Sequence, residues 1–294
     1  MQKSTDNTMY LEIPARDGFL LAATLYADAA PSRQVRVVLV NSATGVKRSF
    51  YDKYARFLAE SGFTVITFDY RGIGDSRPST LNKFKAFMHE WGEKDIAGVI
   101  DWIGQRYAGA KLLVVGHSVG GQVMGLAQNN TRVSAMLLVA SQSGYWRLWP
   151  RPSRYLVFIF WYAVIPVLAG LFSYLPSRFL GLGEDLPAGV AFEWASWGRD
   201  PKHVLGKNLL QTKECFNNYT SPVLAYSVAN DFLAPPATVD ALMTFYPNAQ
   251  KTRKHITPQN LNVRHFGHFD FFREQFKESL WQESVSWLKA QSES

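Results

Sequence analysis

Short apolar segments of strand length alternate with segments of helical periodicity along most of this chain. The expected strands are 20–26, 35–40, 63–68, 111–116, 133–140, 221–227 and 251–257, and the expected helices are 50–60, 91–107, 119–128, 237–245 and 271–290. Nearly continuous apolar strands that alternate with helices are typical of a parallel sheet covered on both faces. The sequence therefore predicts an α/β fold with a mostly parallel central sheet of about eight strands flanked by helices.

This alternation is interrupted once, over residues 145–216. Aromatic residues are concentrated there, with 15 in these 72 positions against 14% in the whole chain. A chain of 294 residues with 47% apolar residues can form one large α/β core. We therefore expect a core built from residues 1–144 and 217–294, with 145–216 inserted as an aromatic-rich helical cap.

Charge and cysteine content exclude several classes of protein. The formal net charge is +7, but basic and acidic residues are interspersed, which is typical of a solvated surface and not of a nucleic-acid-binding face. The single cysteine, Cys215, excludes an intrachain disulfide framework and a four-cysteine zinc site. Residues 1–8 are polar and do not have the pattern of a signal peptide, so we expect a cytoplasmic protein.

The most informative motif is the hexapeptide Gly-His-Ser-Val-Gly-Gly at 116–121, between an expected strand and an expected helix. A serine on a sharp strand-to-helix turn is exposed for nucleophilic attack, and the residues two before and two after it must be small. Gly116 and Gly120 meet that requirement, so Ser118 is the candidate nucleophile. His117 is interpreted as structural.

With this motif in this setting, the chain resembles the α/β-hydrolase fold superfamily. It is most similar to serine hydrolases of the monoacylglycerol lipase-like and serine aminopeptidase-like groups. The resemblance covers nearly all of the chain except the insertion. It implies a catalytic triad in the chain order serine, acid, histidine.

The resemblance places the acid after the strand that follows the insertion, where Asp231 stands in the segment Asn-Asp-Phe-Leu-Ala-Pro-Pro. It places the base after the last strand, where Gly267 and His268 match the family pattern of a small residue before histidine. His265 is the competing base, although its position fits the end of the strand better.

The resemblance also implies an oxyanion hole made of two backbone N–H groups. The first is that of Val119, directly after the serine. The second belongs to the loop after the strand 35–40, where Ala43 is the first choice and Thr44 the alternative. This loop departs from the His-Gly sequence that is usual in the superfamily. The turn at 69–76 also matches the family and is interpreted as structural. No metal-ligand spacing is present, and the expected chemistry needs no cofactor.

The insertion contains 23 residues without a charge, 155–177, which is long enough for a membrane span. A single span would place Ser118 and His268 on opposite sides of the bilayer, so we expect a cap over the site instead. Pro166 and Pro176 predict two short helices with a bend. A cap that also dips into a membrane surface is the main alternative.

These observations predict a serine hydrolase that cleaves a carboxylic ester with a hydrophobic portion through an acyl-enzyme. Ser118, His268 and Asp231 are the expected nucleophile, base and orienting acid. An acyltransferase, a peptidase or a carbon–carbon hydrolase on the same triad stays open, as does a non-catalytic binding protein with this fold.

Overall fold

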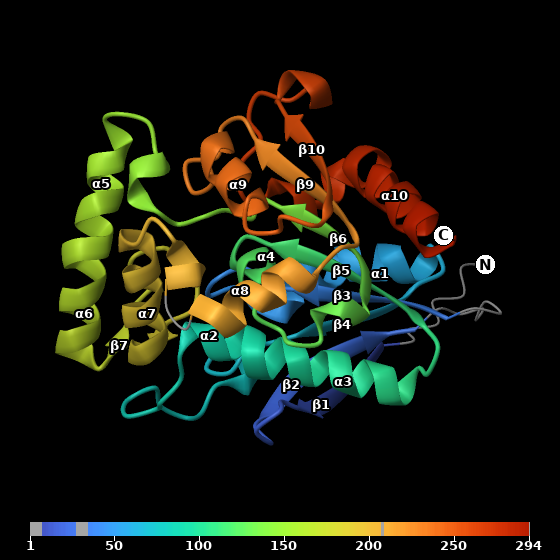
Figure 1. Cartoon of the computed structure of the whole chain (residues 1–294), viewed down its shortest axis with the longest axis horizontal. Helices are drawn as coiled ribbons and strands as arrows, with labels where there is room; N and C mark the ends of the chain where they lie inside the picture. The colour runs from blue at the N-terminus through green and yellow to red at the C-terminus, as the bar shows by residue number, and fades with distance from the viewer. Residues whose placement is uncertain (1–7, 28–34, 207–208, 294) are drawn as a thin grey trace.

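The computed structural model describes residues 8–27, 35–206 and 209–293, which form an eight-stranded sheet with helices on both faces (Figure 1). The sheet order is β1-β2-β4-β3-β5-β6-β9-β10. Its strands are β1 Thr8–Pro14, β2 Leu20–Tyr26, β3 Arg36–Asn41, β4 Thr64–Phe68, β5 Lys111–His117, β6 Val133–Val139, β9 Pro222–Val228 and β10 Gln250–Ile256. Neighbours from β4 to β10 pair in parallel, whereas β2 pairs antiparallel with both β1 and β4. The predicted fold class is therefore confirmed.

The main helices outside the segment 145–216 are α1 Asp52–Glu60, α3 Ala97–Arg106, α4 Val119–Met124, α9 Pro236–Met243 and α10 Gln282–Glu293, and α8 Leu209–Asn218 spans the end of that segment. The short α2 Met88–Glu90 and a π-helical segment, Trp91–Ile96, lead directly into α3. Helices α1 and α10 meet through the rings of Tyr54 and Trp281, whose centroids are 5.3 Å apart.

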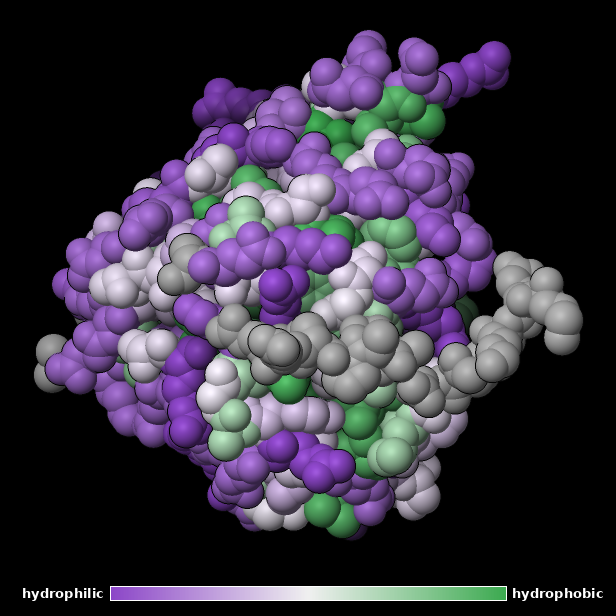
Figure 2. Space-filling view, turned by 90° about the vertical axis from the view of Figure 1, so that its right-hand side faces the viewer, coloured by the Kyte–Doolittle hydropathy of each residue, from purple (hydrophilic) through white to green (hydrophobic). Residues whose placement is uncertain are grey.

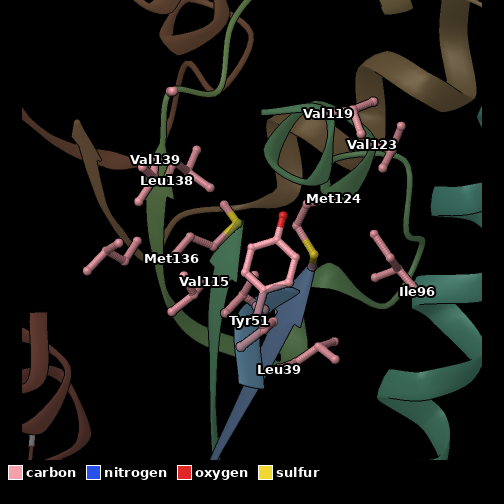
Figure 3. Packing of buried hydrophobic residues seen from close by; sticks show 14 of the residues in the cluster. Leu39, Tyr51, Ile96, Val115, Val119, Val123, Met124, Met136, Leu138 and Val139 are labelled. Carbon is pink, nitrogen blue, oxygen red and sulfur yellow. The ribbon is translucent and has the colours of Figure 1, made fainter. Parts of the chain in front are cut away.

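The centre of the sheet is buried because helices cover both of its faces. Figure 3 shows Leu39 of β3, Val115 of β5 and Met136 of β6 packed near Val123 and Met124 of α4. All five side chains are fully buried. This packing explains why the central strands are continuous apolar runs, which made them the easiest elements to predict.

Several boundaries differ from the sequence expectations. Strand β1 was not predicted, because this edge strand leaves large apolar side chains such as Met9 and Tyr10 exposed and shows no regular alternation. Helix α4 ends at Met124, four residues early. The expected helix 271–290 is instead two 3₁₀ turns and a π-helical segment before α10 begins at Gln282.

The segment 145–216 contains α5 Ser153–Ile159, α6 Ile165–Phe172, α7 Ala188–Arg199 and most of α8, with a two-stranded ribbon of β7 Tyr174–Leu175 and β8 Leu186–Pro187. The prediction of two short helices with a bend in residues 155–177 is wrong. Helix α5, a π-helical turn and α6 follow one another without a break and form one continuous helix of 20 residues, Ser153–Phe172. A π-helical turn, Phe160–Val164, directly precedes Pro166. Such a turn shifts hydrogen bonds from residue i−4 to i−5, which accommodates a residue without an N–H inside the helix.

A buried imidazole makes folding sensitive to acid. His203 lies against the rings of Trp197 and Phe245, and within the described chain neither of its ring nitrogens has a hydrogen-bond partner. Burial lowers the pKa of His203 to about 3. Between pH 6.5 and about 3 the unfolded chain therefore binds a proton that the folded chain excludes.

We therefore expect the free energy of unfolding to decrease as the pH is lowered from 6.5 to about 3. The contribution of His203 to this decrease is up to about 1.4 kcal/mol per pH unit. His203→Asn keeps a residue that tolerates the positive φ of 49° at this position and removes the titration. Urea unfolding of both proteins at pH 7, 5 and 4 measures the slopes. Equal slopes would show that His203 does not carry the effect.

Candidate active site

The nucleophile turn lies at the carboxyl end of β5, where the chain reverses into α4. Ser118 has φ 52° and ψ −118°, a conformation that is strained for a residue with a side chain. A Cβ at Gly120 would lie 2.4 Å from the carbonyl oxygen of Asn41, and one at Gly121 would lie 2.3 Å from Oγ of Ser141. The sequence prediction that this turn needs small neighbours therefore has a direct steric basis.

The expected base and acid are joined by a short hydrogen bond. Nδ1 of His268 lies 2.7 Å from Oδ2 of Asp231, and both side chains are buried. The other carboxylate oxygen of Asp231 accepts the N–H groups of Leu233 and Ala234, at 2.8 and 2.9 Å. Three donors thus hold the carboxylate in one orientation, which fixes the imidazole ring as well. The competing base, His265, is an exposed side chain 3.6 Å from Asp270 and does not reach Asp231.

Ser118 and His268 line the same cavity, whose volume is about 530 Å³. The hydroxyl of Ser118 donates to Oε1 of Gln142 at 3.5 Å and not to His268. Gln142 follows β6, is buried, and donates from Nε2 to the carbonyl of Leu233 at 3.3 Å. Sequence reasoning missed Gln142, because no motif marks it.

Of the two expected oxyanion donors, Ala43 lines the cavity and Val119 directly follows the cavity-lining Ser118, but the loop after β3 differs in detail from the expectation. The N–H of Ala43 donates to the hydroxyl of Tyr51 at 2.9 Å. Within the described residues the N–H of Thr44, which also lines the cavity, has no hydrogen-bond partner. Val119 is the first residue of α4, where the N–H groups are free of intrahelical bonds.

A chain of buried hydrogen bonds connects this loop to the loop of the base. The hydroxyl of Tyr51 lies 2.8 Å from Nδ1 of His117, and Nε2 of His117 lies 2.9 Å from the carbonyl oxygen of His268. Burial and the nearby His268 lower the pKa of His117 well below its usual range, so its ring is neutral. Tyr51 can then donate to Nδ1 while Nε2–H donates to the carbonyl, and every group in the chain is satisfied. These contacts give His117 a definite structural role. Its hydrogen-bond partner Tyr51 was not predicted from the sequence.

The cavity is lined mainly by apolar side chains, many of them aromatic. Residues from the core include Phe50, Phe232, Leu233 and Phe269, and those from the insertion include Trp149, Leu156, Val157, Phe160, Trp161 and Trp194. A small ligand with an apolar part fits such a lining. Within residues 8–27, 35–206 and 209–293, no group of three His, Cys, Asp or Glu side chains is placed to hold a metal ion.

A loop of the insertion rests directly on the expected oxyanion loop. The N–H of Glu184 donates to the carbonyl oxygen of Gly45 at 2.7 Å. A Cβ at Gly183 would lie 2.5 Å from that same oxygen, so the two backbones can approach only because residue 183 is glycine. The side chain of Glu184 also pairs with Arg178 and Lys47, at 2.6 and 3.6 Å. Because Thr44 is the residue before Gly45, a shift of this loop of the insertion would also displace Thr44.

Residues 37–274 match the model of the alpha/beta hydrolase family, and this chain therefore belongs to that family. No curated protein sequence matches the chain significantly. Among solved structures it is similar to DcsB in complex with its substrate analogue, at 16% identity over 97% of this chain and 99% of that one, with a TM-score of 0.68. It is also similar to Est1E from Butyrivibrio proteoclasticus with bound ferulic acid, at 14% identity over 97% and 100% of the chains, with a TM-score of 0.63.

A monoacylglycerol lipase from Paleococcus ferrophilus is similar at 18% identity over 92% of this chain and 99% of that one, with a TM-score of 0.61. At these identities the likeness concerns the fold. The family match supports a hydrolase.

The hydrogen-bond chain predicts different effects for two buried tyrosines. Tyr51→Phe leaves the N–H of Ala43 and Nδ1 of His117 unpaired, so we expect a loss of about 1–3 kcal/mol in stability and a fall in kcat of about tenfold or more, as both loops shift. Tyr54→Phe, which removes a hydrogen bond of 2.8 Å to Ser284 away from the cavity, is the matched control. We expect it to lose stability with kcat unchanged. Urea unfolding and ester hydrolysis measure the two quantities, and equal kcat values in the two variants would contradict the proposed link.

The loop contact predicts a selective loss of turnover in Gly183→Ala. The added methyl group must push Gly45 away and so displace the neighbouring Thr44, whose N–H is the candidate oxyanion donor. We therefore expect kcat to fall about ten- to a hundredfold, with KM changed much less. Gly109→Ala is the control for backbone strain, because Gly109 also has a positive φ, 78°, and no atom within 4 Å of an added Cβ. Steady-state kinetics on a soluble ester separates kcat from KM. A fall of the same size in both variants would assign the effect to general strain.

Proposed function

We propose that this hydrolase is a serine hydrolase that cleaves carboxylic esters with a hydrophobic portion. The observation that carries the proposal is the 2.7 Å pair of His268 and Asp231 in a cavity that also holds Ser118 on a strained turn. Nucleophile, base and orienting acid are the three parts that activation of a hydroxyl requires.

In the proposed mechanism the hydroxyl of Ser118 turns from Gln142 to Nε2 of His268. The imidazole accepts its proton as Oγ attacks the ester carbonyl, and Asp231 stabilises the cation that forms. The N–H of Val119 and that of Thr44 donate to the oxyanion. We assign this role to Thr44 and not to Ala43, because the N–H of Ala43 already donates a hydrogen bond to the hydroxyl of Tyr51. His268 then protonates the leaving alcohol, and water releases the acyl group by the same steps in reverse.

The cavity supports a small, hydrophobic substrate. Its volume of about 530 Å³ lies in the range of ordinary small-molecule sites. Residues 145–216 supply much of its aromatic lining, so we propose that they act as a lid that selects the acyl or alcohol group and excludes water. Transfer of the acyl group to an alcohol or thiol is the second candidate on the same residues.

Substitutions at the triad test the proposal. We expect Ser118→Ala to abolish hydrolysis of p-nitrophenyl butyrate and labelling by a fluorophosphonate probe, because both need the hydroxyl. His268→Ala should lower kcat by about 10³-fold or more. His265→Ala is the control for the choice of base, and we expect its activity to equal that of the unaltered protein. Labelling that persists in Ser118→Ala would refute the assignment of the nucleophile.

A further inference from the structure

The helix Ser153–Phe172 has an outer face that consists of apolar side chains open to solvent. One side of the helix packs on the rest of the protein through Val157, Trp161, Ile165 and Ala169, at a spacing of four residues. The exposed side chains are Tyr155 at 52%, Leu156 at 64%, Ile159 at 50%, Tyr162 at 45%, Val167 at 63%, Leu171 at 72% and Phe172 at 47% exposure. Phe179, in the loop that follows, is 92% exposed.

A helix that is apolar on all sides belongs in apolar surroundings, and a large exposed apolar patch marks an interaction surface. Helices α5 and α6 lie at the outer edge of the molecule, with α7 beside them (Figure 1). The opposite end of the molecule, at the right in Figure 1, is mostly hydrophilic with scattered apolar residues (Figure 2). Among the described residues, eight of the 17 exposed large apolar side chains lie between Tyr155 and Phe179, so exposed apolar surface is concentrated in the insertion.

The helix is long and apolar enough to cross a membrane, but its packing places it along the protein surface. Its inner residues are buried from Val157 to Ala169, and α6 packs on α7. A helix attached to its own protein along one side cannot pass separately through a bilayer. It can lie parallel to the membrane plane with only its outer face in the acyl region.

The charges around the face favour an anionic membrane over a second copy of the chain. Arg147, Arg151 and Arg154 precede the apolar stretch, and the sequence has no Asp or Glu between Asp101 and Glu184. Arg178, which follows the stretch, is already paired with Glu184. Basic residues around an apolar face match anionic headgroups.

We propose that the helix Ser153–Phe172 lies in the surface of anionic lipid membranes, with its outer face among the acyl chains. Leu156 connects this surface to the active site, because it is 64% exposed and also lines the cavity. An apolar substrate can pass along this side chain from the bilayer into the cavity. The docking surface is separate from the triad and does not depend on hydrolysis.

Vesicle sedimentation tests the proposal with the full chain. We expect the protein to sediment with vesicles of phosphatidylcholine and phosphatidylserine at 3:1, and much less with pure phosphatidylcholine. The double variant Val167→Glu with Leu171→Glu places two charges on the outer face at residues that do not line the cavity. We expect at least tenfold weaker binding and unchanged turnover of p-nitrophenyl butyrate. Leu20→Glu, a 52% exposed leucine on β2, is the matched control and should bind as the unaltered protein does.

The other outcomes each decide against the proposal. Absence of sedimentation with anionic vesicles overturns it, as does equal binding by the double variant. A dimer in solution that the double variant converts to a monomer would assign the face to a second copy. Ser118→Ala separates this proposal from the proposed function, since it should bind vesicles fully while hydrolysing nothing.

Discussion

The strained turn at Ser118 is the constraint on which the arrangement of the site depends. It persists because β5 and α4 are held in place by a fully buried core and because glycines 120 and 121 let the turn approach Asn41 and Ser141 closely. Those contacts fix the end of α4, and hence the N–H of Val119, relative to β3. Because β3, β5, β6, β9 and β10 run parallel, the loops that carry Thr44, Ser118, Gln142, Asp231 and His268 meet at one edge of the sheet.

Around that turn, the site is positioned mainly by hydrogen bonds to neighbouring loops. Asp231 is held by two backbone donors, and His268 is held through its side chain by Asp231 and through its carbonyl by His117. His117 is in turn joined through Tyr51 to the loop of Ala43. His117 thus connects the loop of His268 to the loop of Ala43 and Thr44. Because its ring is neutral, it can accept on one nitrogen and donate from the other.

The sequence was sufficient for the parts of this structure that follow from local chemistry. Continuous apolar strands predicted the fold class, and glycines around a serine marked the turn at Ser118. The pairing of Asp231 with His268 was predicted from the family resemblance that this turn implied, and it is present in the structure. The sequence was insufficient for elements and side chains whose structure is determined by packing against residues far away in the chain. Strand β1 is an edge strand without regular alternation, and the helix through Pro166 depends on a π-helical turn that proline alone does not indicate. Gln142 and Tyr51 carry no motif, since their roles arise from side chains 24 and 66 residues distant.

The place of the insertion in the sheet has a consequence for how such a protein can change. Strands β6 and β9 are direct neighbours although 82 residues lie between Val139 and Pro222. The two ends of the intervening segment therefore leave and rejoin the core at adjacent points. Beyond Ser141 and Gln142, which contact the Ser118 turn, the length and sequence of this segment can vary without altering strand pairing, provided that a loop still rests on Gly45. The proposed lid, and with it the range of substrates that it selects, can therefore change by exchange of one continuous stretch of gene while the loops that carry Ser118, Asp231 and His268 stay where they are.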